Sequence, residues 1–267
     1  MSYEFGCNRS AAWPGGDEMI ARSQHEGVLT LRLAHGKASA LDVELLDALT
    51  RELDGVAEDV RALVLTGTGS IFSAGVDLFR ITQGGADYVR HFLPLLSRFL
   101  GTLFAFPRPV VAAVNGHAIA GGCVIALAAD ARLMAEGAGR IGVPELLVGV
   151  PFPAAALEVV RFAVPGDKVQ SLIYTGRILS AREALGAGLV DEVVSPDALP
   201  ARAQEVARKL ALIPPPVYRL TKHSLRAKAL ERIEGAGELQ DRAALEVWSA
   251  AETHAQIREY LRRTLGK

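Results

Sequence analysis

Cysteine is scarce in this sequence, and its scarcity excludes a disulfide-stabilised or thiol-ligated scaffold. The chain has 267 residues and two cysteines, Cys7 and Cys123, which form no Cys-x-x-Cys pair. Two isolated cysteines in a chain of this length are typical of a reduced compartment, so we expect a cytoplasmic protein. The six histidines are scattered without the short spacings of a metal site. We therefore predict no bound metal.

An excess of charge of one sign is also absent. The chain carries 29 basic and 30 acidic residues, well interspersed, for a formal net charge of −1. Binding to nucleic acid normally requires basic residues clustered in excess. We therefore expect no nucleic-acid partner.

Long apolar runs are limited to Val110–Ala129, which has no formal charge. This run contains Asn115-Gly116, a turn signal, and the pair Gly121-Gly122. A buried strand, a turn and a buried helix explain it better than a membrane span, so we expect no membrane partner. Residues 1–18 are polar and glycine-rich and lack the apolar stretch of a signal peptide. For these residues we predict a poorly ordered extension.

The common cofactor and nucleophile motifs are missing as well. The sequence has no Walker-type phosphate loop, no His-Glu-x-x-His, no Gly-x-Ser-x-Gly elbow and no complete dinucleotide fingerprint. Gly67-Thr68-Gly69 comes nearest to the last of these, but the third glycine is absent. These absences predict a protein that works without a bound cofactor.

Short strands alternate with helices in the first part of the chain, and helices alone follow. Strands are predicted at Gly27–Leu33, Ala62–Thr66, Val110–Val114, Ala131–Ala135, Arg140–Val143 and Leu189–Val194. Helices are predicted after the N-cap Asp42, over Ala86–Phe104, from Gly121 through Ala129, and over Ala181–Leu185, Val217–Lys228 and Ile233–Leu265. This order predicts an α/β fold, with a core over residues 19–205 and a helical region over residues 206–267.

Two segments are suited to holding a ligand with backbone groups. Ile71–Leu78 and Ala113–Cys123 are rich in small residues, which let the backbone approach a ligand closely. In the second segment a strand runs into a turn, and Gly121-Gly122 opens a helix. The first N–H groups of a helix lack intrahelical acceptors, so they suit a developing oxyanion.

A third segment, Gly142–Pro151, holds a single carboxyl group, Glu145, among apolar residues. Such surroundings disfavour the charged form of a carboxylate and raise its pKa. Glu145 is therefore a candidate general base. The alternative is a partly exposed loop glutamate paired with an arginine such as Arg140. The residues alone leave both interpretations open.

These segments, together with Lys37–Asp42 and Ser180–Val194, resemble in order and spacing the enoyl-CoA hydratase/isomerase (crotonase) superfamily, over about residues 25 to 262. The resemblance implies a crotonase-like spiral of ββα repeats. It also implies C-terminal helices that build a homotrimer or a dimer of trimers. The implied substrate is an acyl-CoA thioester, so coenzyme A would enter with the substrate and no separate cofactor is expected.

The resemblance further implies an oxyanion hole made by the backbone N–H groups of Val76 and Gly121. Because the backbone donates, a valine side chain is acceptable at position 76. The substrate-binding residues that the resemblance implies are Lys37, Ala38 and Ala40 on the adenine and pantetheine side, with Ala74, Asp77, Leu78, Gly122 and Val124 nearer the thioester. Many relatives carry a lysine near the position that Arg80 occupies here. Arg80 is expected either to meet a phosphate or to be solvated. Lys222 is expected either to reach coenzyme A or to be solvated.

Val124 departs from the pattern of hydratases. Relatives that hydrate enoyl thioesters usually carry two glutamates that flank one water, and here Glu145 fills the second position while Val124 fills the first. Valine cannot hold or activate water, so the pattern favours a single-glutamate Δ3,Δ2-enoyl-CoA isomerase in which Glu145 moves a proton from C2 to C4. Two alternatives stay open. One is an enoyl-CoA hydratase or other crotonase-type enolate chemistry, and the other is a non-catalytic acyl-CoA binding protein.

Overall fold

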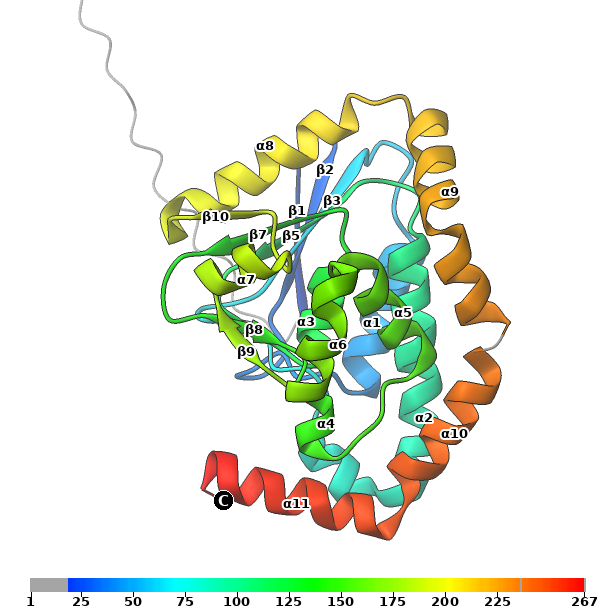
Figure 1. The fold of residues 1–267 in the computed structure, drawn as a ribbon. Helices are drawn as coiled ribbons and strands as arrows, with labels where there is room; N and C mark the ends of the chain where they lie inside the picture. The colour runs from blue at the N-terminus through cyan, green and yellow to red at the C-terminus, as the bar shows by residue number, and fades with distance from the viewer. Residues whose placement is uncertain (1–18, 236, 267) are drawn as a thin grey trace, which may run out of the picture.

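Two β-sheets and a surrounding layer of helices make up the fold of the computed structural model (Figure 1). The structure describes residues 19–235 and 237–266, so the extension predicted at residues 1–18 lies outside it. The predicted α/β fold class is confirmed. No helix in the described ranges combines the length and the apolar character needed to span a bilayer.

The larger sheet has six strands in the order β1-β2-β3-β5-β7-β10. Its strands are β1 Ile20–His25, β2 Val28–Leu33, β3 Ala62–Thr66, β5 Val110–Val114, β7 Ala131–Ala135 and β10 Glu192–Val194. The β1–β2 pair is antiparallel and the remaining neighbours are parallel. β1 is an exposed edge strand with one buried residue, Ile20. It has no apolar alternation, and the sequence pattern therefore missed it.

The smaller sheet has the order β4-β6-β8-β9 and consists of three-residue strands. These strands are β4 Ile71–Ser73, β6 His117–Ile119, β8 Arg140–Gly142 and β9 Ile178–Ser180. Each turn of the chain places one strand in the large sheet, the next in the small sheet and then a helix. β3-β4-α2, β5-β6-α3 and β7-β8-α4 are three such turns, and they form the predicted spiral of ββα repeats.

Helices cover both faces of the large sheet (Figure 1). In the spiral these are α1 Val43–Asp54, α2 Leu78–Ala105, α3 Gly121–Ala128, α4 Glu145–Val148, α5 Ala154–Ala163, α6 Gly166–Thr175 and α7 Ala181–Ala187. They are followed by α8 Leu199–Ala211, α9 Pro215–Glu234, α10 Gly237–Ser249 and α11 Ala251–Leu265. Alternate residues of β3 divide between the two cores: Leu63 and Leu65 face α1 to α3, whereas Val64 packs with Ala203 of α8.

The helix predicted over Ala86–Phe104 begins eight residues earlier, at Leu78, and ends at Ala105. Asp77 caps its first turn by accepting hydrogen bonds from the N–H groups of Phe79 and Arg80 at 3.0 Å. Gly85 has φ 65° and ψ −158°, which interrupts the helical backbone. The glycines at this interruption break the helical periodicity of the sequence, so the pattern did not reveal the first turns of the helix.

The single helix predicted over Ile233–Leu265 is wrong, because the chain bends twice in this range. α9 continues to Glu234, and Ala250 has an extended backbone (φ −69°, ψ 142°) between α10 and α11. The His254 ring nitrogen Nε2 lies 2.9 Å from the Trp248 carbonyl oxygen and holds this corner. The bend turns α11 beneath α2 and α4 (Figure 1).

A buried ion cluster attaches α9 to the core. Asp130 accepts hydrogen bonds from Lys222 Nζ at 2.7 Å, Arg226 Nη2 at 2.8 Å and the Val110 N–H at 2.8 Å. The side chains of Lys222 and Arg226 are 6% and 5% exposed. Burial lowers the pKa of Lys222 to about 8, although the Asp130 carboxylate acts in the opposite direction. Asp130 is therefore the counter-charge for two desolvated cations.

Replacing Asp130 by Ala should destabilise the fold by about 3–5 kcal/mol, because it leaves two buried positive charges uncompensated. The measurement is urea-induced unfolding of both proteins at pH 7. Asp87→Ala is the matched control: Asp87 is 92% exposed and pairs only with Arg90 at the surface. The control should change stability by less than about 1 kcal/mol. Equal effects of the two substitutions would contradict this account.

Candidate active site

An apolar cavity lies where the turns of the spiral meet the C-terminal helices. Its mainly apolar lining suits a small acyl group. Six of the residues predicted from the sequence line it: Ala74, Val76, Leu78, Gly121, Val124 and Glu145. The structure thus brings all three chemically suggestive segments to one place.

Glu145 is the first residue of the short helix α4 and is 8% exposed. Its Oε2 atom has no hydrogen-bond partner among the described residues. Burial raises the pKa of Glu145 to about 8, and a hydrogen bond to its own backbone lowers it in part. Arg140 instead donates to the carbonyl oxygens of Ala138 and Gly139. The alternative of an exposed Glu145–Arg140 pair is therefore wrong.

The bridge that holds the Val76 turn does not use the N–H of Val76, for which no acceptor is found within the described ranges. In this parallel bridge Leu41 donates its N–H to the Gly75 carbonyl at 2.8 Å and accepts from the Asp77 N–H at 3.0 Å. Both bonds use the neighbours of Val76, so the N–H of Val76 points away from Leu41. Val76 lines the cavity on that other side.

Gly121 offers a second N–H at the same wall. As the first residue of α3, it lies where helix geometry provides no intrahelical acceptor. The preceding residue, Ala120, has φ 50°, a conformation that costs energy for a non-glycine residue. The Ala120 N–H donates to the Gly142 carbonyl at 2.8 Å, and this bond holds the turn.

The turns that carry the two N–H groups are in direct contact. Gly75 has φ +79°, and a Cβ atom there would lie 2.5 Å from the Ile119 carbonyl oxygen and 2.9 Å from the Gly121 nitrogen. Only glycine fits such a contact at such an angle. Val76 and Gly121 thus lie on adjacent turns and both line the apolar cavity, an arrangement that suits binding of a carbonyl oxygen by backbone N–H groups.

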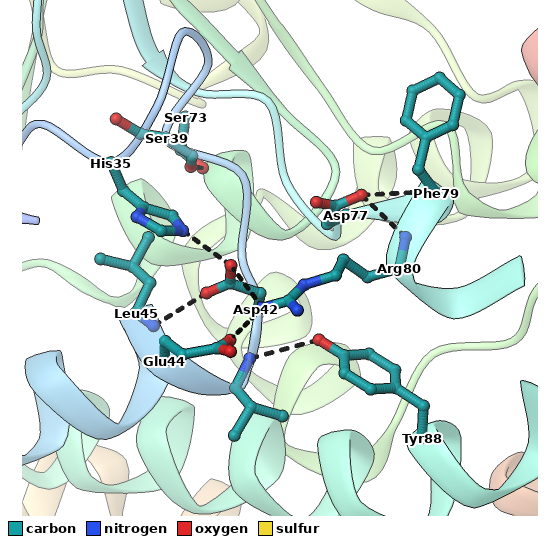
Figure 2. Close-up of polar contacts among 11 residues, drawn as sticks. His35, Ser39, Asp42, Glu44, Leu45, Ser73, Asp77, Phe79, Arg80 and Tyr88 are labelled. Atoms are coloured by element: carbon teal, nitrogen blue, oxygen red, sulfur yellow. Dashed lines mark hydrogen bonds and ion pairs between the residues drawn. The ribbon is translucent and has the colours of Figure 1, made fainter. Parts of the chain in front are cut away.

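A polar network around Asp42 holds the loop before α1 (Figure 2). Asp42 caps α1 by accepting from the Leu45 N–H at 2.9 Å, and its other oxygen lies 2.7 Å from His35 Nε2. Arg80 Nη2 lies 2.5 Å from Glu44 and 3.5 Å from Asp42. The loop is therefore anchored to the helices α1 and α2 on either side.

Arg80 and Lys222 both lie outside the cavity wall. Arg80 is 41% exposed, pairs with Glu44 and lies over the Tyr88 ring, 5.8 Å from the centroid. Its contact with a phosphate stays a prediction. Lys222 is buried in the Asp130 cluster rather than solvated, and this cluster is not part of the cavity wall.

The remaining predicted site residues lie around the cavity rather than in its wall. Gly122 packs on Ser73, and Asp77 caps α2. Ala38 accepts a hydrogen bond from the Ala74 N–H at 3.0 Å, which places the segment with Lys37 and Ala40 beside the cavity edge. Lys37 is exposed. The binding roles of these residues stay predictions.

Val124 lies in the first turn of α3, fully buried, and contributes to the cavity wall. Among the described residues that line the cavity, Glu145 is the one acidic side chain. Elsewhere in the described ranges, no three histidine, cysteine or acidic side chains converge to hold a metal ion. Within the described residues the site thus combines one carboxyl group with apolar walls.

Sequence reasoning missed the far wall of the cavity. Leu96 and Leu100 come from α2, Phe152 from the α4–α5 loop, and Trp248 and Tyr260 from α10 and α11. The Trp248 indole donates to the Pro151 carbonyl at 2.9 Å and ties α10 to the loop. No local sequence signal marks these residues, because they come together only when the C-terminal helices fold back.

Comparison with known proteins gives consistent results. The family model described as enoyl-CoA hydratase/isomerase matches residues 23–264. A Thermus thermophilus protein that carries the name of an enoyl-CoA hydratase is 40% identical over 198 residues, covering 72% of this chain and 77% of its own. The 2,3-dehydroadipyl-CoA hydratase of Escherichia coli is 29% identical over 248 residues, covering 92% and 95%.

Among solved structures, human mitochondrial Δ3-Δ2-enoyl-CoA isomerase superposes with a TM-score of 0.89. The alignment covers 93% of this chain and 99% of the human protein at 22% identity, a level that shows the shared fold. Since the family model spans nearly the whole described chain and the cavity is built from its motifs, this protein belongs to the enoyl-CoA hydratase/isomerase (crotonase) family.

Proposed function

We propose that this protein is an enoyl-CoA isomerase that moves a double bond from C3 to C2 of an acyl-CoA substrate. The observation that carries the proposal is the cavity wall. Among the described residues Glu145 supplies its one carboxyl group, and Val124 lines it at the position where the resemblance implies the second glutamate of a hydratase. An apolar side chain cannot hold a nucleophilic water. A single base in dry surroundings favours proton transfer over water addition.

In the proposed reaction the thioester carbonyl oxygen accepts hydrogen bonds from the N–H groups of Val76 and Gly121. Glu145 in its ionised form removes a proton from C2. The electrons of that C–H bond move toward the carbonyl, giving a dienolate whose negative charge rests on the oxygen. The protonated Glu145 then delivers the proton to C4, and the double bond is left between C2 and C3. One carboxyl group can serve both carbons because it reaches C2 and C4 from the same face of the planar dienolate.

The raised pKa of Glu145 suits both halves of this cycle. Its pKa of about 8 makes it a stronger base than an exposed glutamate once it is ionised. Its conjugate acid holds the proton long enough to return it. Coenzyme A would enter as part of the substrate, beside Lys37, Ala38 and Ala40, and the chemistry requires no separate cofactor.

Hydration by a single glutamate is the second candidate, since the E. coli relative is named a hydratase. A non-catalytic acyl-CoA binding protein is less favoured. A buried carboxyl group with an unpartnered oxygen atom destabilises a fold, and binding alone would not require one.

We also propose that the protein is cytoplasmic and forms a homotrimer or a dimer of trimers. The exposed apolar side chains of Val217, Leu220 and Leu225 on α9 support the assembly.

Replacing Glu145 by Gln should lower the rate of 3-hexenoyl-CoA isomerisation by about 10²–10⁴, because the amide cannot accept the C2 proton. The measurement follows 2-hexenoyl-CoA formation in a coupled assay. Glu136→Gln is the control, since Glu136 is exposed and pairs with Arg182 at the surface. Full turnover by Glu145→Gln would show that Glu145 is not the base.

The pH dependence of the reaction follows from the pKa of Glu145. The active form of the base is ionised, and burial raises its pKa to about 8. We expect kcat/KM to rise about tenfold per pH unit below that value and to level off above it. A profile that is flat between pH 6 and 9 would show that ionisation of this carboxyl does not limit the rate.

Replacing Val124 by Glu should raise water addition to crotonyl-CoA above the level of the parent enzyme. The new carboxylate would face Glu145 across the cavity and could hold a water between them. Val124→Gln is the matched control, because it adds a polar chain of similar size without a base. Hydration that is equal in both variants would argue against the role assigned to position 124.

A further inference from the structure

Ser73 is a buried hydroxyl at the end of β4 that the proposed reaction does not use. Its exposed fraction is 0%, and its Oγ atom makes two hydrogen bonds. It donates to the Ser39 carbonyl at 2.7 Å and accepts from the Gly75 N–H at 3.2 Å. Figure 2 shows Ser73 beside Ser39, which belongs to the loop before α1.

These two bonds join two turns of unusual backbone conformation. Ser39 has φ 43° and Gly75 has φ 79°. A non-glycine residue such as Ser39 keeps a positive φ only when its surroundings hold it there. The Gly75 N–H is one residue before the Val76 N–H, so the Ser73 hydroxyl fixes the peptide next to the first amide donor.

Ser73 also contacts the helix that carries the second donor. A Cβ atom on Gly122 would lie 2.3 Å from the Ser73 carbonyl oxygen and 2.9 Å from the Ser73 Cβ. Residue 122 must therefore be glycine for α3 to approach this closely. Through its side chain Ser73 holds the Val76 turn, and through its backbone it is packed against the start of α3.

We infer that Ser73 is a positioning residue that sets the distance and angle between the N–H groups of Val76 and Gly121. The inference rests on the proposed function in that these amides bind the thioester carbonyl. Donors to an oxyanion must lie about 2.7–3.1 Å from it. A displacement of about 1 Å costs about 100-fold in rate, so a single hydroxyl at this junction controls the strength of carbonyl polarisation.

The kinetic test compares Ser73→Ala with Thr50→Val. Thr50 is a matched control because its buried hydroxyl donates to the Leu46 carbonyl at 2.8 Å inside α1, away from the cavity. We expect Ser73→Ala to lower kcat about tenfold or more while KM changes less than about twofold, since the lost interaction matters most in the transition state. Thr50→Val should keep the parent kcat. Equal kcat in the two variants would overturn the inference.

A spectroscopic readout separates positioning from general loss of structure. Hexanoyl-CoA has no double bond to move, so its bound carbonyl reports the amides alone in isotope-edited infrared spectra. We expect a shift to lower frequency on binding to the parent and to Thr50→Val, and a smaller shift with Ser73→Ala. An unchanged shift in Ser73→Ala would overturn the inference.

The same spectra distinguish failure of the inference from failure of the proposed reaction. A reduced shift in Ser73→Ala, in a protein that does not isomerise 3-hexenoyl-CoA, would support Ser73 and reject the isomerase. The absence of any shift in the parent would reject the oxyanion hole and the inference together. If Ser73→Ala does not fold, Ser73→Cys keeps a side chain with weaker hydrogen bonding. It should show a smaller effect in the same direction, and parent-like values would overturn the inference.

Discussion

The close approach of the Gly75 turn to the start of α3 is the constraint on which the rest of the site depends. Both segments follow parallel strands of the small sheet, β4 and β6, so their ends emerge side by side. The contact leaves no room for a side chain at position 75 or position 122. Each turn has a backbone angle that needs outside support, and the loop before α1 supplies part of it. Val76 and Gly121, the two residues proposed to donate their N–H groups, are thereby brought to one apolar cavity.

The state of Glu145 in the cavity wall is governed by desolvation. Glu145 is held at the start of a short helix, and its Oε2 atom finds no partner in the described chain. The buried thiol of Cys123 is near enough for the charge of Glu145 to raise its pKa further, so it provides no compensating charge. Burying a carboxyl group in this way costs stability, and the raised pKa is the measurable consequence. The fold tolerates this cost because its extensive apolar core lies on both sides of the large sheet.

The C-terminal helices complete the cavity while being attached elsewhere. α9 is fixed by the Asp130 cluster, and α10 is tied to the α4–α5 loop by Trp248 and by Asp241, which accepts from the Ala154 N–H at 2.6 Å. α11 packs on α2 and α4, and its residue Tyr260 lines the cavity. Residues of α10 and α11, distant in sequence from Val76, Gly121 and Glu145, thus complete the lining of the cavity.

Local features of this protein were determined by the sequence itself. Asp42 caps α1, Ser180 and Glu183 form the capping box of α7, and β3, β5 and β7 have the predicted bounds, because caps and short β-branched runs act over a few residues. The resemblance of the motifs also predicted the family. Tertiary structure alone decided the burial of Glu145, the pairing of Lys222 with Asp130, 92 residues away, and the wall formed by Trp248 and Tyr260. These features depend on which distant segments exclude water from one another, and no local pattern specifies that.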